Sequence, residues 1–197
     1  MSSQVSYERT GRQRQKARTR EALLDAARAL LARGVHPTVE DAAAEAGVSR
    51  ATAYRYFPNQ RVLLAAVQPQ IEAPSLLGED PPDDPEERLA IVVDAIIRMT
   101  LHVEPALRAM LRVSLEPREE GAELPFRKGR RITWVAEALE PLRDRLPRAE
   151  FDRLAIAIAS AVGIDALVWL TDVAGLSRDD AAETMRWSSR ALLGAAL

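Results

Sequence analysis

Residues 47–60 read GVSRATAYRYFPNQ, a glycine turn followed by a short segment rich in tyrosine and arginine. Aromatic residues make up only 5% of the chain, yet three of them fall between positions 54 and 57. Gly47 permits a sharp turn, and Ser49 is a good N-cap for a helix that runs to about Phe57. The segment therefore predicts a short helix that presents two tyrosines and two arginines together.

The residues just before this turn have the pattern of another short helix. Thr38 is a good N-cap for a helix over 39–46. Two short helices joined by a tight turn form a helix-turn-helix. At 100° per residue, Ala53 and Phe57 on the second helix point towards the first and have a core spacing. The rest of its surface is polar or small and carries Ala51, Thr52, Tyr54 and Arg55, with Arg50 and Tyr56 at the edges.

The polar side of the second helix has the size and chemistry that the major groove of DNA accepts. The groove admits one α-helix, and an arginine makes a bidentate contact with guanine. Tyrosine and threonine hydroxyls reach phosphate oxygens, and the helix N-terminus at Ser49 favours a phosphate. Ala51 lets the helix approach closely, and its methyl group can touch a thymine methyl. We therefore predict a DNA-reading surface on this helix.

The rest of the chain shows helical periodicity and almost no strand signal. The first domain is expected to begin with a helix over 18–33, which ends at Gly34, and to close with a helix capped by Asn59. After the linker, the periodicity predicts helices at 85–101, 104–115, 126–145, 148–173 and 178–195. The expected fold is all-α, with about nine helices. Its parts are a basic N-terminal arm (1–17), a helix-turn-helix domain with a connecting fourth helix (18–70), an acidic proline-rich linker (71–85) and a second helical domain (86–197).

Charge is distributed unevenly along the chain. Residues 1–70 hold 11 Lys and Arg against 6 Asp and Glu, whereas residues 71–197 hold 16 against 23. A basic N-terminal part fits a polyanionic partner. Its arm contributes arginines and a lysine suited to the DNA backbone or minor groove, although basic termini also occur as plain solubilising tails: Arg9, Arg12, Arg14, Lys16, Arg18 and Arg20.

Several classes of protein are disfavoured by composition. The chain has no cysteine, which excludes disulfides, thiol catalysis and zinc–thiolate sites. Its two histidines, His36 and His102, lie in different domains, so neither a metal site nor a Ser-His-Asp set is expected. No apolar segment opens the chain, and the longest apolar run is short for a membrane span. We expect a cytoplasmic protein that is not an enzyme, does not associate with membranes and has no cofactor.

The N-terminal part closely resembles the TetR family of bacterial transcriptional regulators. The resemblance covers roughly residues 15–67 and is carried by Val39, Asp41, Ala43, Ala46, Gly47, Val48, Ser49, Thr52, Tyr54, Tyr56, Phe57, Asn59 and Leu63. It implies that bases are read by Arg50, Ala51, Tyr54 and Arg55. It also implies phosphate contacts from Thr38, Thr52 and Tyr56, which join Ser49 at the helix N-terminus.

Three positions depart from the pattern of that family. Ala42 replaces the usual isoleucine and Ala53 the usual leucine, so the core of the small domain looks underfilled. Gln60 stands where a phosphate-binding lysine is common. Arg61 is a candidate to replace that lysine, although it faces another side of its helix.

The C-terminal helices are expected to form a homodimer. The segment 148–173 is apolar on almost every side and so must be buried on more than one face. Together with the last helix it could form a four-helix interface with twofold symmetry, as the resemblance also implies; the alternative is that both helices are interior to a monomer. The candidate interface residues are Ala159, Gly163, Leu167, Met185, Ser189 and Leu192.

The resemblance also implies a cavity for a small-molecule effector, apolar or amphipathic, in the second domain. Asp165 is a candidate of particular interest, because an ionised carboxylate within an apolar run needs a partner for its charge. Core packing remains the alternative for each of the other side chains. The candidate pocket residues are Val93, Ile97, Thr100, His102, Met110, Trp134, Asp165 and Trp169.

Together these features indicate a ligand-responsive transcriptional regulator. It is expected to act as a repressor and to bind a pseudopalindromic operator of double-stranded DNA as a homodimer. A transcriptional activator, an effector-independent repressor and an architectural DNA-binding protein remain alternatives.

Overall fold

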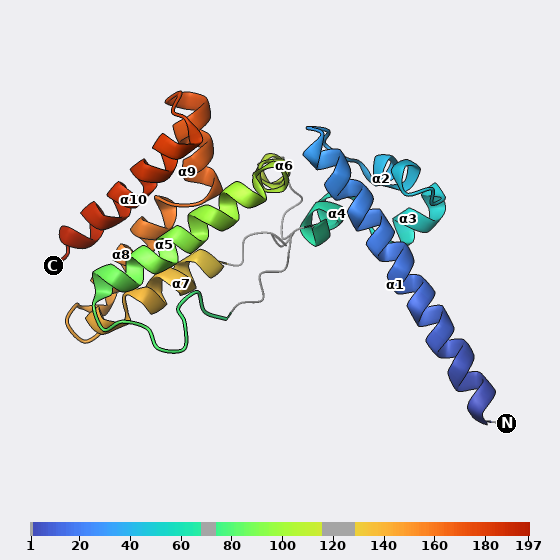
Figure 1. Cartoon of the computed structure of the whole chain (residues 1–197), viewed down its shortest axis with the longest axis horizontal. Helices are drawn as coiled ribbons and strands as arrows, with labels where there is room; N and C mark the ends of the chain where they lie inside the picture. The colour runs from blue at the N-terminus through green and yellow to red at the C-terminus, as the bar shows by residue number, and fades with distance from the viewer. Residues whose placement is uncertain (1, 68–73, 116–128) are drawn as a thin grey trace. The chain divides into compact units, whose positions relative to one another are not determined.

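The computed structural model describes residues 2–67, 74–115 and 129–197, with side chains from residue 14 onward (Figure 1). The regular secondary structure of these ranges is entirely helical, as predicted, and the chain divides into two compact units. The first unit contains α1 (Ser2–Ala32), α2 (Val39–Glu45), α3 (Arg50–Tyr56) and α4 (Gln60–Val67). The second contains α5 (Pro85–His102), α6 (Glu104–Ser114) as far as Leu111, α7 (Arg130–Ala138), the 3₁₀ turn η1 (Glu140–Leu142), α8 (Arg148–Ser160), α9 (Ile164–Val168), the π-helical turn η2 (Trp169–Val173) and α10 (Arg178–Gly194).

The first helix is much longer than predicted. It begins at Ser2, so the segment predicted as a separate arm forms the first half of a 31-residue helix. That half extends beyond α2, α3 and α4 (Figure 1). Arginine, glutamine and lysine have high helix propensities, and no proline interrupts them. The expected boundary at residue 18 was wrong because it followed the apolar periodicity, which starts only at Leu23.

The first unit packs α2 and α4 against the C-terminal half of α1, and α3 against α2. The two alanines of the predicted underfilled core, Ala42 and Ala53, are fully buried. Phe57 is also buried, and the Arg20 guanidinium lies 5.7 Å from the centre of its ring. Small side chains at 42 and 53 suit a close approach of the helices, and Phe57 is one of several large side chains that fill this core, with Leu23, Leu24, Leu63 and Leu64.

Two of the long helices predicted in the second unit are shorter than expected. The helix predicted over 126–145 is described from Arg130 and ends at Ala138, because Pro141 lacks an N–H to continue the helical hydrogen bonds. The segment 148–173 bends by 47° between α8 and the α9–η2 segment. The bend lies at Gly163, whose φ of +91° favours glycine.

An arginine of α7 holds this bend together. The Arg131 guanidinium donates to the carbonyl of Val162 and forms a 2.6 Å ion pair with Asp165. It therefore satisfies a carbonyl left unpaired at the end of α8 and supplies the partner that the Asp165 carboxylate was expected to need.

A second charged cluster joins the start of α6 to η2 and α10. Glu104, buried at the first position of α6, accepts hydrogen bonds from Arg108 (2.7 Å) and Arg178 (2.6 and 3.0 Å). Arg108 also forms a bidentate pair with Asp172 at 2.6 and 2.8 Å. This pair, with a hydrogen bond from Thr171, lowers the pKa of Asp172 to about 2. Each charge of the cluster has a partner, as a buried carboxylate requires.

Among the described residues, no single helix has the length and apolar character of a membrane span; the bent pair of α8 with α9–η2 does so only when its two parts are taken together. Over the same ranges, no group of three acidic or histidine side chains is arranged to hold a metal ion.

Candidate nucleic-acid interface

The turn between α2 and α3 is built by two capped helix starts. At α2, the Thr38 hydroxyl accepts from the N–H of Asp41 (3.1 Å), and the Asp41 carboxylate accepts from the N–H of Thr38 (2.8 Å), which is a capping box. The N–H and the hydroxyl of Thr38 both donate to the Asp41 carboxylate, and these two bonds hold the pKa of Asp41 below its ordinary value. At α3, the Ser49 hydroxyl accepts from the N–H of Thr52 at 3.3 Å. Between them, Gly47 adopts a φ of +64°.

The capped α3 has one packed side and one exposed side. Ala53 and Phe57 are buried, as their spacing predicted. The opposite side is open to solvent and carries all four side chains that were predicted to read bases: Arg50, Ala51, Tyr54 and Arg55. The structure therefore brings the predicted readers together on one accessible face.

A carboxylate of α2 contacts two of these readers. The Tyr54 hydroxyl donates to Oε1 of Glu40 at 2.7 Å, and a guanidinium nitrogen of Arg50 forms an ion pair with the same oxygen. The hydrogen bond from Tyr54 and the charge of Arg50 lower the pKa of Glu40 from its ordinary value. The same contact raises the pKa of the Tyr54 phenol and of the Arg50 guanidinium. Sequence reasoning missed Glu40, because only the fold shows that it lies next to residues 10 and 14 positions later.

The predicted phosphate-binding residues lie on α3 and on the segments next to it, and they differ in their burial and in the hydrogen bonds that they form within the protein. Thr38 and Ser49 are helix caps, and Ser49 also donates to the Thr52 hydroxyl at 2.9 Å. Tyr56 and Arg61 are half-buried. The Gln60 amide donates to the backbone carbonyl of Pro37 at 3.0 Å, so it ties the start of α4 to the loop before α2.

The residues predicted to line an effector pocket fall into three groups. Val93, Ile97 and Thr100 of α5, Met110 of α6 and Trp134 of α7 are buried. The Thr100 hydroxyl donates to the Ile96 carbonyl of its own helix at 2.7 Å. His102, in contrast, is exposed at the end of α5, where it does not line an interior cavity.

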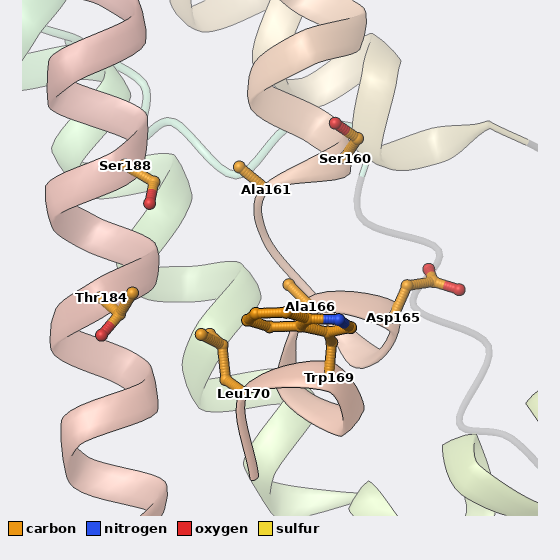
Figure 2. Close-up of a pocket in the computed structure, with 8 residues that line it drawn as sticks. All are labelled: Ser160, Ala161, Asp165, Ala166, Trp169, Leu170, Thr184 and Ser188. Carbon is orange, nitrogen blue, oxygen red and sulfur yellow. The ribbon is translucent and has the colours of Figure 1, made fainter. Parts of the chain in front are cut away.

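The other two, Asp165 and Trp169, line an open pocket of about 330 Å³ between α10 and the α8–α9 bend (Figure 2). Its lining consists of Ser160, Ala161, Asp165, Ala166, Trp169, Leu170, Thr184 and Ser188. Figure 2 shows the Trp169 ring beside Ala166, and the Asp165 carboxylate turned away from α10. That orientation agrees with its ion pair to Arg131.

Most of the residues predicted to form a dimer interface are buried within a single protomer. Ala159, Gly163, Leu167, Met185 and Ser189 are buried, and Leu192 is half-buried. Little surface of the five buried residues is left exposed in one protomer, and the interface at these six positions stays a prediction. The small residue at 163, in particular, admits the Arg131 side chain rather than another helix.

Comparison with known proteins places the first unit in a defined group. Residues 23–67 match the sequence family described as bacterial regulatory proteins, tetR family. A curated relative, the HTH-type transcriptional repressor LfrR of Mycolicibacterium smegmatis, is 30% identical over 173 aligned residues, which covers 74% of this chain and 90% of the relative. A solved structure, the SmeT–triclosan complex, has the same fold, with a TM-score of 0.58 and 19% identity over 90% of each chain.

Proposed function

Because this chain belongs to the TetR family of bacterial regulatory proteins, we propose that it is a ligand-responsive repressor that binds a specific DNA operator as a homodimer. The observation that carries the proposal is the exposed face of α3, where Arg50, Ala51, Tyr54 and Arg55 lie opposite the buried Ala53. The kinship with LfrR, described as a transcriptional repressor, supports repression over activation.

In this proposal, α3 enters the major groove and its flanks contact the backbone. Arg55 is exposed near the end of α3, and its guanidinium suits a bidentate contact with guanine. Thr52 and Tyr56 supply hydroxyl groups for phosphates, and the basic first half of α1 adds sequence-independent attraction. A twofold dimer presents two such helices to successive major grooves about 34–36 Å apart, which is why a pseudopalindrome is expected.

The DNA proposal is tested by selecting bound fragments from a random or genomic DNA pool and then measuring affinities for the selected site. We expect wild-type protein to prefer this site over bulk DNA by at least about 10³-fold. An Arg55→Ala variant should bind it about 5- to 150-fold more weakly, the range that corresponds to losing one bidentate base contact.

Glu79→Ala is a matched control, because it removes an exposed charge in the second unit. Its circular dichroism spectrum and operator affinity should equal those of wild type. Equal affinity of wild type for all sequences would instead indicate an architectural DNA-binding protein. Undiminished operator binding by folded Arg55→Ala would remove Arg55 from the reading surface.

The proposed dimer uses the exposed side of α8 and α10 in place of the buried residues predicted from sequence. Ile156 is one turn from Ser160 on α8, and Trp187 stands between Thr184 and Ser188 on α10. Trp169 lies in the pocket between these helices. These three apolar side chains are 54–65% exposed. Large apolar side chains exposed on neighbouring elements are typical of an interface, and twofold symmetry would pair them with their own copies.

The effector is proposed to bind among the buried side chains of α5, α6 and α7. Val93, Ile97 and Trp134 belong to one apolar cluster, which fits an apolar or amphipathic compound. The likeness to a structure of SmeT with triclosan supports a ligand site in this fold. An effector that binds better to a dimer with misplaced reading helices would depopulate the DNA-binding form. Changing the ratio of the DNA-binding form to the effector-bound form from 99:1 to 1:99 needs about 5.5 kcal/mol of difference in binding free energy between the two forms.

Two tryptophan substitutions test this location. A compound found by screening for release of the operator should bind Trp134→Phe about fivefold or more weakly, because the ring loses area and an N–H donor. The matched variant Trp169→Phe changes the open pocket instead and should leave that affinity unchanged. The reverse pattern, measured by calorimetry on both folded variants, would move the effector site to the open pocket.

A further inference from the structure

The carboxylate of Glu40 joins two side chains that are proposed to read DNA, although it belongs to the other helix of the motif. Its Oε1 accepts from the Tyr54 hydroxyl at 2.7 Å and pairs with Arg50. The side chain of Arg50 is otherwise 73% exposed, and that of Glu40 is 36% exposed. The first unit thus presents a neutral ion pair, and not an unpaired cation, on this part of its proposed DNA-binding face.

This arrangement changes what Arg50 gains from DNA. A backbone phosphate offers Arg50 roughly the contact that Glu40 already supplies, so binding to arbitrary DNA gains little from this arginine. The negative charge of Glu40 is also repelled by nearby phosphates. A compensating gain requires new acceptors in the groove, and the O6 and N7 atoms of a correctly placed guanine provide them.

Glu40 also fixes the position of Tyr54. A hydroxyl that donates to the carboxylate keeps its oxygen lone pairs as acceptors, so Tyr54 would meet the groove in one defined orientation. Holding a contact group in place before binding reduces the ordering cost of binding and favours the matching sequence.

We propose that Glu40 is a specificity-determining residue, which positions Tyr54 and withholds the charge of Arg50 from non-cognate DNA. This inference rests on the proposed function, because it requires α3 to be the DNA-reading helix. Its action is through Tyr54 and Arg50, so it is a positioning residue and not itself a base reader.

The test is Glu40→Gln, which keeps an oxygen acceptor for Tyr54 and removes the charge that pairs with Arg50. We expect affinity for non-cognate DNA to rise roughly three- to tenfold, the scale of one added phosphate contact, while operator affinity rises less. The slope of log K against log salt concentration on non-cognate DNA should steepen by about 1. The ratio of operator to non-cognate affinity should therefore fall, by at most the roughly three- to tenfold rise in non-cognate affinity.

Glu45→Gln is the matched control. It removes the same charge from the same helix, but Glu45 pairs at 2.9 and 3.0 Å with Arg33, in the turn that follows α1, and Arg33 is not a proposed reader. It should leave the specificity ratio unchanged, apart from the general effect of one charge. In an Arg50→Ala background, Glu40→Gln should no longer steepen the salt dependence, because the released cation is absent.

The outcomes separate this inference from its premise. If wild-type protein shows no preferred site, the proposed function fails whatever Glu40 does. If wild type has a preferred site but Glu40→Gln and Glu45→Gln give the same ratio and salt slope, the specificity role is overturned. An equal weakening of operator and non-cognate binding by Glu40→Gln would likewise overturn it, since that result assigns Glu40 a purely structural part.

Discussion

A Trp187→Glu variant is expected to remain a monomer at concentrations where the wild-type protein forms the proposed dimer. Trp187 is 65% exposed on α10 and lies between two residues that line the pocket beside Trp169. A tryptophan buried in an interface contributes about 2 kcal/mol or more to the binding free energy. Because of the twofold symmetry, the substitution removes one such tryptophan from each protomer. The introduced carboxylates would also have no partner. The dimer dissociation constant should therefore rise by about 10³-fold or more.

Operator binding should weaken with the dimer. A monomer binds one half-site only, whereas in a dimer the first bound subunit holds the second at a high effective concentration near the other half-site. Losing this effect should lower operator affinity by roughly 10²-fold or more. Sedimentation across a concentration series measures the first effect, and titration of a labelled operator measures the second. Ile132→Glu, at a 41% exposed isoleucine on α7, is the matched control and should remain dimeric. A Trp187→Glu protein that sediments as a dimer at low micromolar concentration would contradict this interface.

The helix-turn-helix motif was predictable because its signals are local. Thr38 and Ser49 cap the helices that they were predicted to cap, and Gly47 takes the positive φ of the turn. Ala53 and Phe57 face the core because a fixed helical period orients them. None of these conclusions needed knowledge of which distant residues meet.

The second unit was less predictable because its apolar helices carry no directional signal. Gly163 was interpreted as a small residue for helix approach, yet an arginine 32 positions earlier occupies the space beside it. Leu167 and Met185 are buried inside the protomer, whereas the exposed apolar side of α10 carries Trp187. A sequence that is apolar all round shows that burial is needed, but not which neighbour provides it.

The contact between Arg131 and Gly163 predicts the largest effect on stability. Gly163 has φ +91° and ψ −163°, a region essentially restricted to glycine, where another residue costs about 1–3 kcal/mol. A Cβ there would also collide with the Arg131 guanidinium, coming within 3.0 Å of its Cζ atom. Displacing that group breaks its bonds to the Val162 carbonyl and Asp165. Gly163→Ala should therefore destabilise the second unit by about 2–4 kcal/mol and lower its melting temperature by roughly 5–15 °C.

Intrinsic fluorescence can follow this unfolding, because all three tryptophans, at 134, 169 and 187, belong to the second unit. Two variants separate the causes. Gly175→Ala has a similar positive φ of +73° but open space around the new Cβ, so it should show only the smaller backbone cost. Arg131→Ala loses the bonds without the collision, so combining it with Gly163→Ala should cost less than the sum of the two single changes. If Gly163→Ala is no more destabilising than Gly175→Ala, the arginine does not hold the bend between α8 and α9.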